Sequence, residues 1–461
     1  MLFVVSSNVD KVDPATRKLI RSHVMLGKKK KKRGAPNSDR RVIRATPAHI
    51  SPVGLNEVME TFNPLLYRRV GPDFSFVDFA KGVEPSIAMN LNITSCSPVA
   101  KRVMFPLMME IGFHSESGET LYPVEADPAA LHITAFCVEE FIQRVLQRQP
   151  NSINPVSMLH LQRGLRLLRE RLLGDEGDLK ISDSTVGTVM KLCGTAHFKG
   201  EYKASRHHME GLRKMVDLRG GLDVFKGKFL LTELLRCDLR IALLDASTPV
   251  FYRQPSEPVP EYPKKLVPSP DSKPFSDDND RLIHHLNKEL ATAWWVMRRF
   301  CLIVNLGVQT QWPVYTEVIH DTMVSVIYRL LSMEFPASSL DEVMRLGLLT
   351  FSYHGFLQWQ DVKPPHHEFH TTYQECILHL GVVEGVTPQL TLWLLMIAAN
   401  SLFDISDEEW LENSMRDCID KCRIMTWKQM QELLMSFMWI PLLDERSGMQ
   451  IYEWLFPDQE K

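Results

Sequence analysis

The sequence predicts an all-α protein that begins with a basic, largely disordered arm. Two observations predict this class. After the arm, apolar residues recur at intervals of three and four, and helix-capping residues precede several of these stretches. Alternating strand patterns and Asn-Gly hairpin turns do not interrupt this periodicity. We therefore expect a bundle of about a dozen or more helices.

The arm comprises residues 1–52. A short β-prone piece, Met1–Val5, and a weak helix at Ala15–Leu26 come before an unbroken basic run, Lys28–Arg33. Glycine, proline, asparagine and serine follow the run at short intervals, and no packed element favours such a composition. The arm is therefore expected to be mostly disordered.

Charge separates the arm from the remainder of the chain. Between Arg17 and Arg44, twelve Lys or Arg stand against a single Asp, a net charge of +11. Because the whole chain carries −3, the other residues together carry −14. A basic run must stay solvated or bind an acidic partner, since burying it unpaired costs too much free energy. It is typical of a nuclear import signal, of phosphate contacts that ignore sequence, or of a solubilising tail. For import or phosphate contact the candidates are Lys28, Lys29, Lys30, Lys31, Lys32, Arg33, Arg40 and Arg41.

Bulk composition is that of a soluble globular protein. The 461 residues suffice for two or three domains, and 44% are hydrophobic while 24% are charged. The apolar stretch Leu2–Val5 is too short for a signal peptide, and Leu392–Phe403 is too short to span a bilayer. We expect a protein without a membrane segment, located in the nucleus.

The first helices of the body have clear start signals. Asp127-Pro128 combines a capping side chain with proline at the first helical position, and predicts a helix over 129–149. From Pro155 to Leu173, leucines and a methionine line one side while arginine and glutamate line the other, which predicts an amphipathic helix.

Later helices are marked by the S/T-x-x-E/Q capping box. In this pattern the first side chain accepts a hydrogen bond from the backbone of the fourth residue. Thr387-Pro388 marks one more start, with the helix expected from Gln389. The boxes pair Ser339 with Glu342, Ser406 with Glu409, and Thr426 with Gln429.

A proline-rich stretch divides the body. Eight prolines lie between Pro249 and Pro274, and proline removes a backbone donor and disfavours helix at the preceding residue. We expect an extended connector at 248–279, between a first helical half at 53–247 and a second at 280–461. Two packed halves joined by a surface loop fit this pattern as well as two independent domains.

Chemistry-bearing motifs were sought, and no catalytic, cofactor-binding or metal site is predicted. The phosphate-loop, dinucleotide, zinc-protease and nucleophile-elbow motifs are not present in the sequence. His366 and His370 could share a helix face and bind zinc with Glu368 nearby, but a solvated loop or helix start is favoured. Cys418 and Cys422 share a helix face, where two core side chains are favoured over a metal or redox pair.

One segment carries a family resemblance. His208–Leu222 has the pattern H-x-x-G-L-x-x-M-V-x-L-R-G-G-L, which resembles a hallmark of the regulatory domain of fungal-specific transcription factor proteins. Arg236–Phe251 is similar to the family's D-L…A…P-x-F continuation. Arg17–Lys28 is similar to the I-R-S-H-V-M opening of a subset of members. Glu342–Phe351 and Trp427–Ile440 also follow the family's pattern, so the likeness spans most of the chain.

The resemblance implies a multi-helix regulatory domain, and the motif itself has an architectural interpretation. One helix face would be seated in the core by Met209, Leu212, Met215, Val216 and Leu222. The two glycines would end the helix in the left-handed conformation. The arginine before them suits the C-terminal end of the helix dipole. The motif residues are His208, Gly211, Leu212, Met215, Val216, Leu218, Arg219, Gly220, Gly221 and Leu222.

The chain departs from the family at its beginning. Many members start with a Zn₂Cys₆ cluster that places a helix in the DNA major groove. Here the first cysteine is Cys96, so no such cluster is present. We expect a nuclear regulator, not an enzyme, acting through protein partners or a small-molecule effector. Its expected partners are an import receptor and other transcription regulators, with DNA contacted only weakly or indirectly, and a homodimer is compatible with the sequence.

Two alternatives stay open. The helical fold could serve as a small-molecule-binding protein or an unrecognised enzyme, with His366, His367 and His370 near its pocket. The arm could also make the protein a weak DNA binder without sequence preference, because a flexible lysine run does not recognise base edges.

Overall fold

The computed structural model describes residue 107 and residues 127–146, 154–175, 177–251, 283–310, 316–357, 363–383 and 385–456. The chain divides into two units, Met1–His49 and Ile50–Lys461, and all described residues belong to the second. The predictions for the arm, including those for Met1–Val5, Ala15–Leu26 and Lys28–Arg33, lie outside the described residues. Most of the predicted connector at 248–279 also lies outside them.

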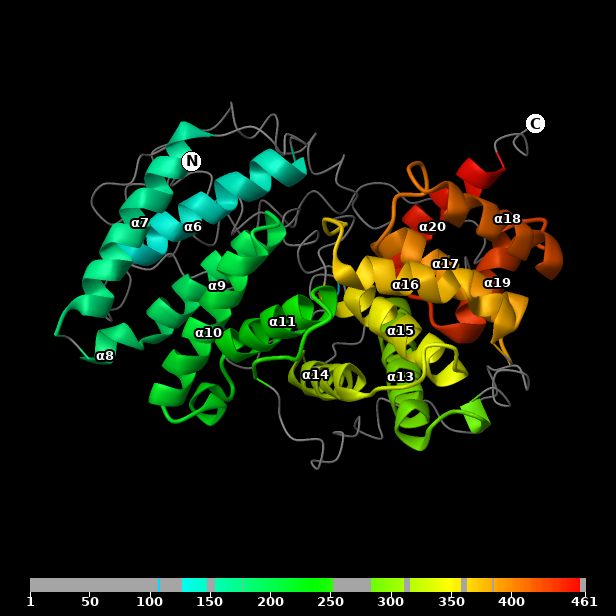
Figure 1. The fold of residues 1–461 in the computed structure, drawn as a ribbon, viewed down its shortest axis with the longest axis horizontal. Helices are drawn as coiled ribbons and strands as arrows, with labels where there is room; N and C mark the ends of the chain where they lie inside the picture. Colours follow the sequence, from blue (N-terminus) through cyan, green and yellow to red (C-terminus); the bar gives the residue numbers. More distant parts are fainter. Residues whose placement is uncertain are drawn as a thin grey trace, which may run out of the picture. The chain divides into compact units, whose positions relative to one another are not determined.

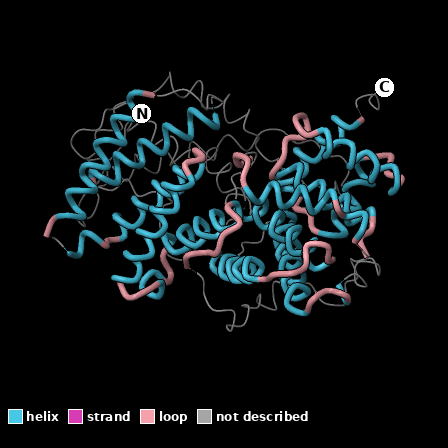
Figure 2. The backbone as a smooth tube through the Cα atoms, in the orientation of Figure 1, coloured by secondary structure: helices cyan, strands magenta, loops and turns pink. Residues whose placement is uncertain are grey.

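The prediction of an all-α fold is confirmed. In the described ranges every regular element is a helix, and loops link the helices (Figure 2). On the N-terminal side of the predicted connector these are α6 (Pro128–Phe141), α7 (Pro155–Leu173), α8 (Gly177–Lys180), α9 (Asp183–Phe198), α10 (Tyr202–Leu218) and α11 (Phe229–Leu244). After it come α13 (Lys288–Thr310), α14 (Thr316–Ser332), α15 (Leu340–Ser352), α16 (Glu368–Leu378), α17 (Pro388–Ser401), α18 (Glu409–Cys422), α19 (Trp427–Phe437) and α20 (Pro441–Leu455).

Two of these helices continue as π-helical turns, at Ile142–Leu146 after α6 and at Tyr353–Leu357 after α15. Short 3₁₀ turns lie at Leu222–Phe225 and Leu380–Val382. None of the helices in the described ranges is both long and apolar enough to cross a membrane.

Helix α6 begins where the sequence predicts. The Asp127 carboxylate accepts hydrogen bonds from the backbone N–H groups of Ala129 and Ala130, and Pro128 occupies the first helical position. The same carboxylate accepts two hydrogen bonds from the Arg171 guanidinium, at 2.7 and 2.6 Å. Because Arg171 lies in the last turn of α7, one side chain both caps α6 and ties it to α7, and the two helices lie side by side (Figure 1).

Helix α10 contains most of the resemblance motif. Met209, Leu212 and Val216 are buried, and the helix ends at Leu218, with Arg219 as its C-cap residue before the glycine pair. Gly220 and Gly221 have φ angles of +98° and +97°, which a side chain would strain. The predicted glycine stop is therefore confirmed.

Arg219 has a more specific role than a favourable position on the helix dipole. Its guanidinium forms an ion pair with Asp183 at the start of α9 and lies 4.3 Å from the centre of the Phe225 ring. These contacts connect the end of α10 to both neighbouring segments.

The predicted starts in the second half are confirmed with one exception. The hydroxyl groups of Ser339, Thr387 and Thr426 accept the expected backbone hydrogen bonds and cap α15, α17 and α19. The start predicted at Ser406 is wrong. Helix α18 begins at Glu409 after an N-cap glutamate, because the Ser406 hydroxyl bonds to acidic side chains beside it, Asp404 and Asp407.

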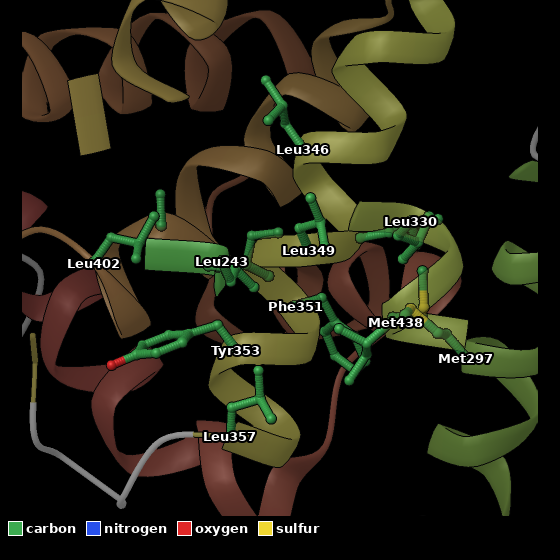
Figure 3. Close-up of a cluster of buried hydrophobic side chains, with 14 of the residues drawn as sticks. Leu243, Met297, Leu330, Leu346, Leu349, Phe351, Tyr353, Leu357, Leu402 and Met438 are labelled. Carbon is green, nitrogen blue, oxygen red and sulfur yellow. The ribbon is translucent and has the colours of Figure 1, made fainter. Parts of the chain in front are cut away.

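The core contains side chains from both sides of the predicted connector. Helix α11 packs against α14, α16 and the π-helical turn after α15. Figure 3 shows Leu243 of α11 among buried residues of the later helices, including Met297, Leu349 and Phe351. Helix α11 therefore joins the earlier helices to the later ones.

A buried carboxylate strengthens this junction. Asp238 of α11 accepts hydrogen bonds from the backbone N–H groups of Val250 and Phe251, both at 2.8 Å, and from the Tyr328 hydroxyl of α14 at 2.9 Å. Burial raises the pKa of Asp238, and these three donors oppose that effect. The chain after α11 is thereby held against α14.

Candidate functional site

Three helix ends that are far apart in the sequence bring polar side chains together. His197 is the penultimate residue of α9, Asp245 is the C-cap residue of α11, and His367 is the residue before α16. We call these three residues the His-Asp-His cluster. Each offers one atom of a type that binds metal ions, and these atoms lie within 4.8 Å of one another.

Local turn geometry puts the first two residues in place. After α9, Gly200 has a φ of +81°, and the N–H of Glu201 donates to the carbonyl of Ala196, so that the chain reverses directly after His197. After α11, Ala246 has a φ of +47°, which is uncommon for a residue with a side chain. The backbone thus accepts strain at the position next to Asp245.

Aromatic rings enclose the cluster. The rings of His197 and His367 are stacked, with centroids 5.0 Å apart and an interplanar angle of 15°. The ring of Tyr202, the first residue of α10, lies 4.4 Å from that of His367. The Tyr202 hydroxyl donates to the carbonyl of His366 at 3.5 Å. These contacts hold the segment before α16 against α9 and α10.

The polar atoms of the cluster approach one another without forming hydrogen bonds. Oδ1 of Asp245 lies 3.5 Å from Nε2 of His197 and 3.5 Å from Nδ1 of His367, beyond the usual N–H···O range of about 2.7–3.2 Å. Among the described residues, Nε2 of His197, Nε2 of His367 and Oδ2 of Asp245 are buried and make no hydrogen bond. Such atoms carry a desolvation cost of about 1–3 kcal/mol each.

The environment favours a carboxylate beside a neutral imidazole. Burial alone would raise the pKa of Asp245, but polar contacts with His197 and His367 hold it well below its usual range. Burial lowers the pKa of His197, and the charges of Arg240 and His367 lower it further, against the opposing effect of Asp245. An ionised carboxylate and a neutral imidazole are the forms in which these side chains bind metal ions.

The histidines singled out from the sequence lie in this region, but in a different arrangement. Helix α16 starts at Glu368, so His366 is on the preceding loop, and its ring lies 5.1 Å from that of His370. The Nδ1 atom of His370 accepts a hydrogen bond from the backbone N–H of His367. Burial, followed by the charges of His366 and His367, lowers the pKa of His370 to about 4. His370 therefore positions His367, which is the member that reaches the cluster.

The other residues singled out from the sequence are not part of the His-Asp-His cluster. The basic residues from Lys28 to Arg33, with Arg40 and Arg41, lie outside the described residues. The motif residues lie along α10 and in the turn after it. Cys418 is buried on α18, and burial raises its pKa to about 11, which disfavours the thiolate that a metal or redox pair needs.

Sequence reasoning missed His197 and Asp245. Neither residue stands in a recognisable motif, because the site is formed by three separate helix ends. The available signal was a polar residue placed at each of those ends.

Comparison of the chain with family models, with curated proteins and with solved structures finds no match.

Proposed function

We propose that this chain is a nuclear regulator of the fungal transcription-factor type that lacks its own zinc cluster. It acts through protein partners or a small-molecule effector, and the basic arm directs it to the nucleus. The observation that carries the proposal is the segment His208–Leu222, because every specified position of the family-like pattern is present in it.

The geometry of α10 is compatible with that resemblance. The apolar motif positions Leu212 and Val216 are buried, and both glycines after the helix have positive φ angles. The motif therefore supports the regulatory fold without supplying a contact residue for DNA. Recognition of a DNA sequence needs a groove-reading element, and a lysine run is not one.

Support for an effector role comes from the position of the His-Asp-His cluster. It draws one residue from α9, one from the end of α11 and one from the segment before α16. A ligand bound there would contact helices on both sides of the predicted connector. Such a ligand can shift the equilibrium between conformations if it binds one of them more tightly.

The import role is tested by relocation of the protein. The full chain is fused to a fluorescent protein, and Lys28–Arg33 is replaced by six alanines. We expect the fusion to change from mostly nuclear to distributed between nucleus and cytoplasm, because an import receptor recognises clustered positive charge. An unchanged nuclear fraction would refute the import role of the run.

A matched control distinguishes the effect of clustered basic residues on import from the effect of total charge. It replaces six exposed basic residues on the described helices and turns and leaves the arm intact. We expect this variant to stay nuclear, and its loss from the nucleus would contradict a specific role for the run. The six residues are Arg166, Arg169, Arg213, Lys214, Lys226 and Lys428.

A further inference from the structure

We propose that the His-Asp-His cluster is a binding site for a divalent transition-metal ion, zinc by preference. The ligands are the imidazoles of His197 and His367 and the carboxylate of Asp245. This site goes beyond the proposed regulatory function and does not depend on it, since it rests only on the arrangement of these three side chains.

The two spacings between the carboxylate oxygen and the histidine nitrogens fit a tetrahedral ion. Ligands bonded at about 2.1 Å to a tetrahedral zinc ion lie about 3.4 Å apart. Each of the two nitrogen–oxygen distances in the cluster is 3.5 Å. Neighbouring ligands of an octahedral magnesium ion lie only about 3 Å apart, and that ion prefers oxygen to imidazole.

The distances are also longer than those of a direct histidine–carboxylate pair. A histidine and a carboxylate that only pair with each other approach to about 2.7–2.9 Å. Here two imidazoles stand around one carboxylate, each with a nitrogen 3.5 Å from the same oxygen. The side chains of His197, Asp245 and His367 are only 4%, 8% and 1% exposed, so water offers little compensation. A bound cation would engage the carboxylate and both rings at once.

The helix dipoles add a smaller electrostatic contribution to cation binding. The C-terminal ends of α9 and α11 adjoin His197 and Asp245, and a helix C-terminus carries partial negative charge that favours a cation. The N-terminus of α16 beside His367 acts in the opposite sense. Because two C-terminal ends and one N-terminal end face the cluster, the net effect of the helix dipoles favours a cation.

Two arginine side chains near the cluster carry positive charge that would compete with a bound metal ion. The Arg206 guanidinium lies 3.8 Å from Oδ2 of Asp245, yet the Arg206 side chain is 59% exposed. It can turn towards solvent when an ion binds the carboxylate. Arg240 also acts electrostatically on His197.

Three protein ligands give the site a defined chemistry. A tetrahedral ion held by two histidines and one carboxylate keeps one position for water or another small ligand, unlike closed structural sites with four protein ligands. An ion held in this way can exchange that fourth ligand.

The test measures metal binding by the purified full-length protein. After removal of metal with a chelator, Zn²⁺ is titrated in competition with a chromophoric chelator, and metal content is measured by plasma mass spectrometry. We expect one Zn²⁺ per chain. Cobalt(II) in the same site should give the intense visible bands of tetrahedral coordination with nitrogen and oxygen ligands.

Substitutions locate the ion. Asp245→Asn and His197→Gln should each weaken Zn²⁺ binding by more than about 100-fold, since even loss of a group behind the ligands costs about 10–100-fold. His366→Gln is the matched control, because this exposed histidine precedes His367 directly and lies outside the cluster. It should bind as the parent does. Arg206→Gln should bind a few-fold more tightly, because it removes a competing cation without removing a ligand.

Several results would overturn the proposal. It is wrong if the parent protein binds no Zn²⁺ with the expected stoichiometry, or if Asp245→Asn and His366→Gln bind it equally well. Iron(II) bound in place of zinc, and lost in Asp245→Asn, would overturn the choice of metal. If the ligand variants do not fold, as judged by circular dichroism, the cobalt spectrum of the parent and the Arg206→Gln affinity still decide the matter.

Discussion

Replacement of Gly448 by alanine tests the close packing around α20. Gly448 is buried in the middle of this helix, opposite the indole rings of Trp427 and Trp439. A Cβ atom at this position would lie 2.8 Å from Cη2 of Trp427, and 2.8 and 2.9 Å from Cζ2 and Cη2 of Trp439. These are rigid ring atoms, and Trp439 is fully enclosed, so at least one ring or the helix itself must move.

The expected magnitude follows from two opposing effects. Overfilling a close-packed core costs about 1–3 kcal/mol, and three contacts with rigid rings place this variant near the upper end. Alanine in a helix is up to about 1 kcal/mol more favourable than glycine. The net expectation for Gly448→Ala is a loss of about 2 kcal/mol in the free energy of unfolding.

Gly211 in α10 provides the matched control. It is also a glycine inside a helix, but an added Cβ there would meet no atom within 4 Å. Gly211→Ala should therefore increase stability by up to about 1 kcal/mol. Since Gly211 belongs to the resemblance motif, that result would show that this glycine is not required for the stability of the fold.

Urea unfolding followed by tryptophan fluorescence measures both variants against the parent. The two midpoints should shift in opposite directions, and the variants should differ by about 3 kcal/mol. The packing argument fails if Gly448→Ala is as stable as the parent, or if Gly211→Ala is destabilised to the same extent.

Three further predictions address single hydrogen-bonding groups. Burial would raise the pKa of Asp127, but hydrogen bonds, chiefly from Arg171, lower it from 3.8 to about 2. A lowered pKa stabilises the fold above about pH 4, so Asp127→Asn should cost up to about 2 kcal/mol at pH 7 and progressively less between pH 4 and 2, measured by urea unfolding across pH. If the difference in unfolding free energy between Asp127→Asn and the parent does not shrink on acidification, this reasoning is contradicted. Ser339→Ala should cost about 1 kcal/mol because it removes a helix cap, whereas Ser406→Ala should change the urea midpoint little; equal losses would contradict the assigned caps. Tyr328→Phe should cost about 1.5–3 kcal/mol by removing a donor to the buried carboxylate of α11, and an unchanged urea midpoint would refute that role.

The helix starts show how far local sequence patterns determine this fold. The starts at Asp127, Ser339, Thr387 and Thr426 were predictable from local sequence. In each case the capping side chain accepts a hydrogen bond from a backbone N–H group within three residues of it. The start predicted at Ser406 failed for an equally local reason. Acidic neighbours bind its hydroxyl, and the pattern for a capping box does not take such competition into account.

The candidate site shows where such patterns stop being informative. The sequence drew attention to the histidines at 366–370, and the rings of His366 and His370 do lie close together, with centroids 5.1 Å apart. The sequence did not indicate that His367 approaches His197 and Asp245, which come from other helices. Their proximity depends on how α9, α11 and α16 pack.

The sequence by itself determined the all-α class, the helix starts at Asp127, Ser339, Thr387 and Thr426, the glycine stop of α10 and the contrast between a basic arm and an acidic remainder. All of these depend on residues close together in the chain or on composition. Only the tertiary structure decided that α11 joins the two sets of helices, that Gly448 faces two indole rings, and that two histidines and an aspartate meet. Those features arise from side-chain packing between distant segments, for which no local spacing provides a signal.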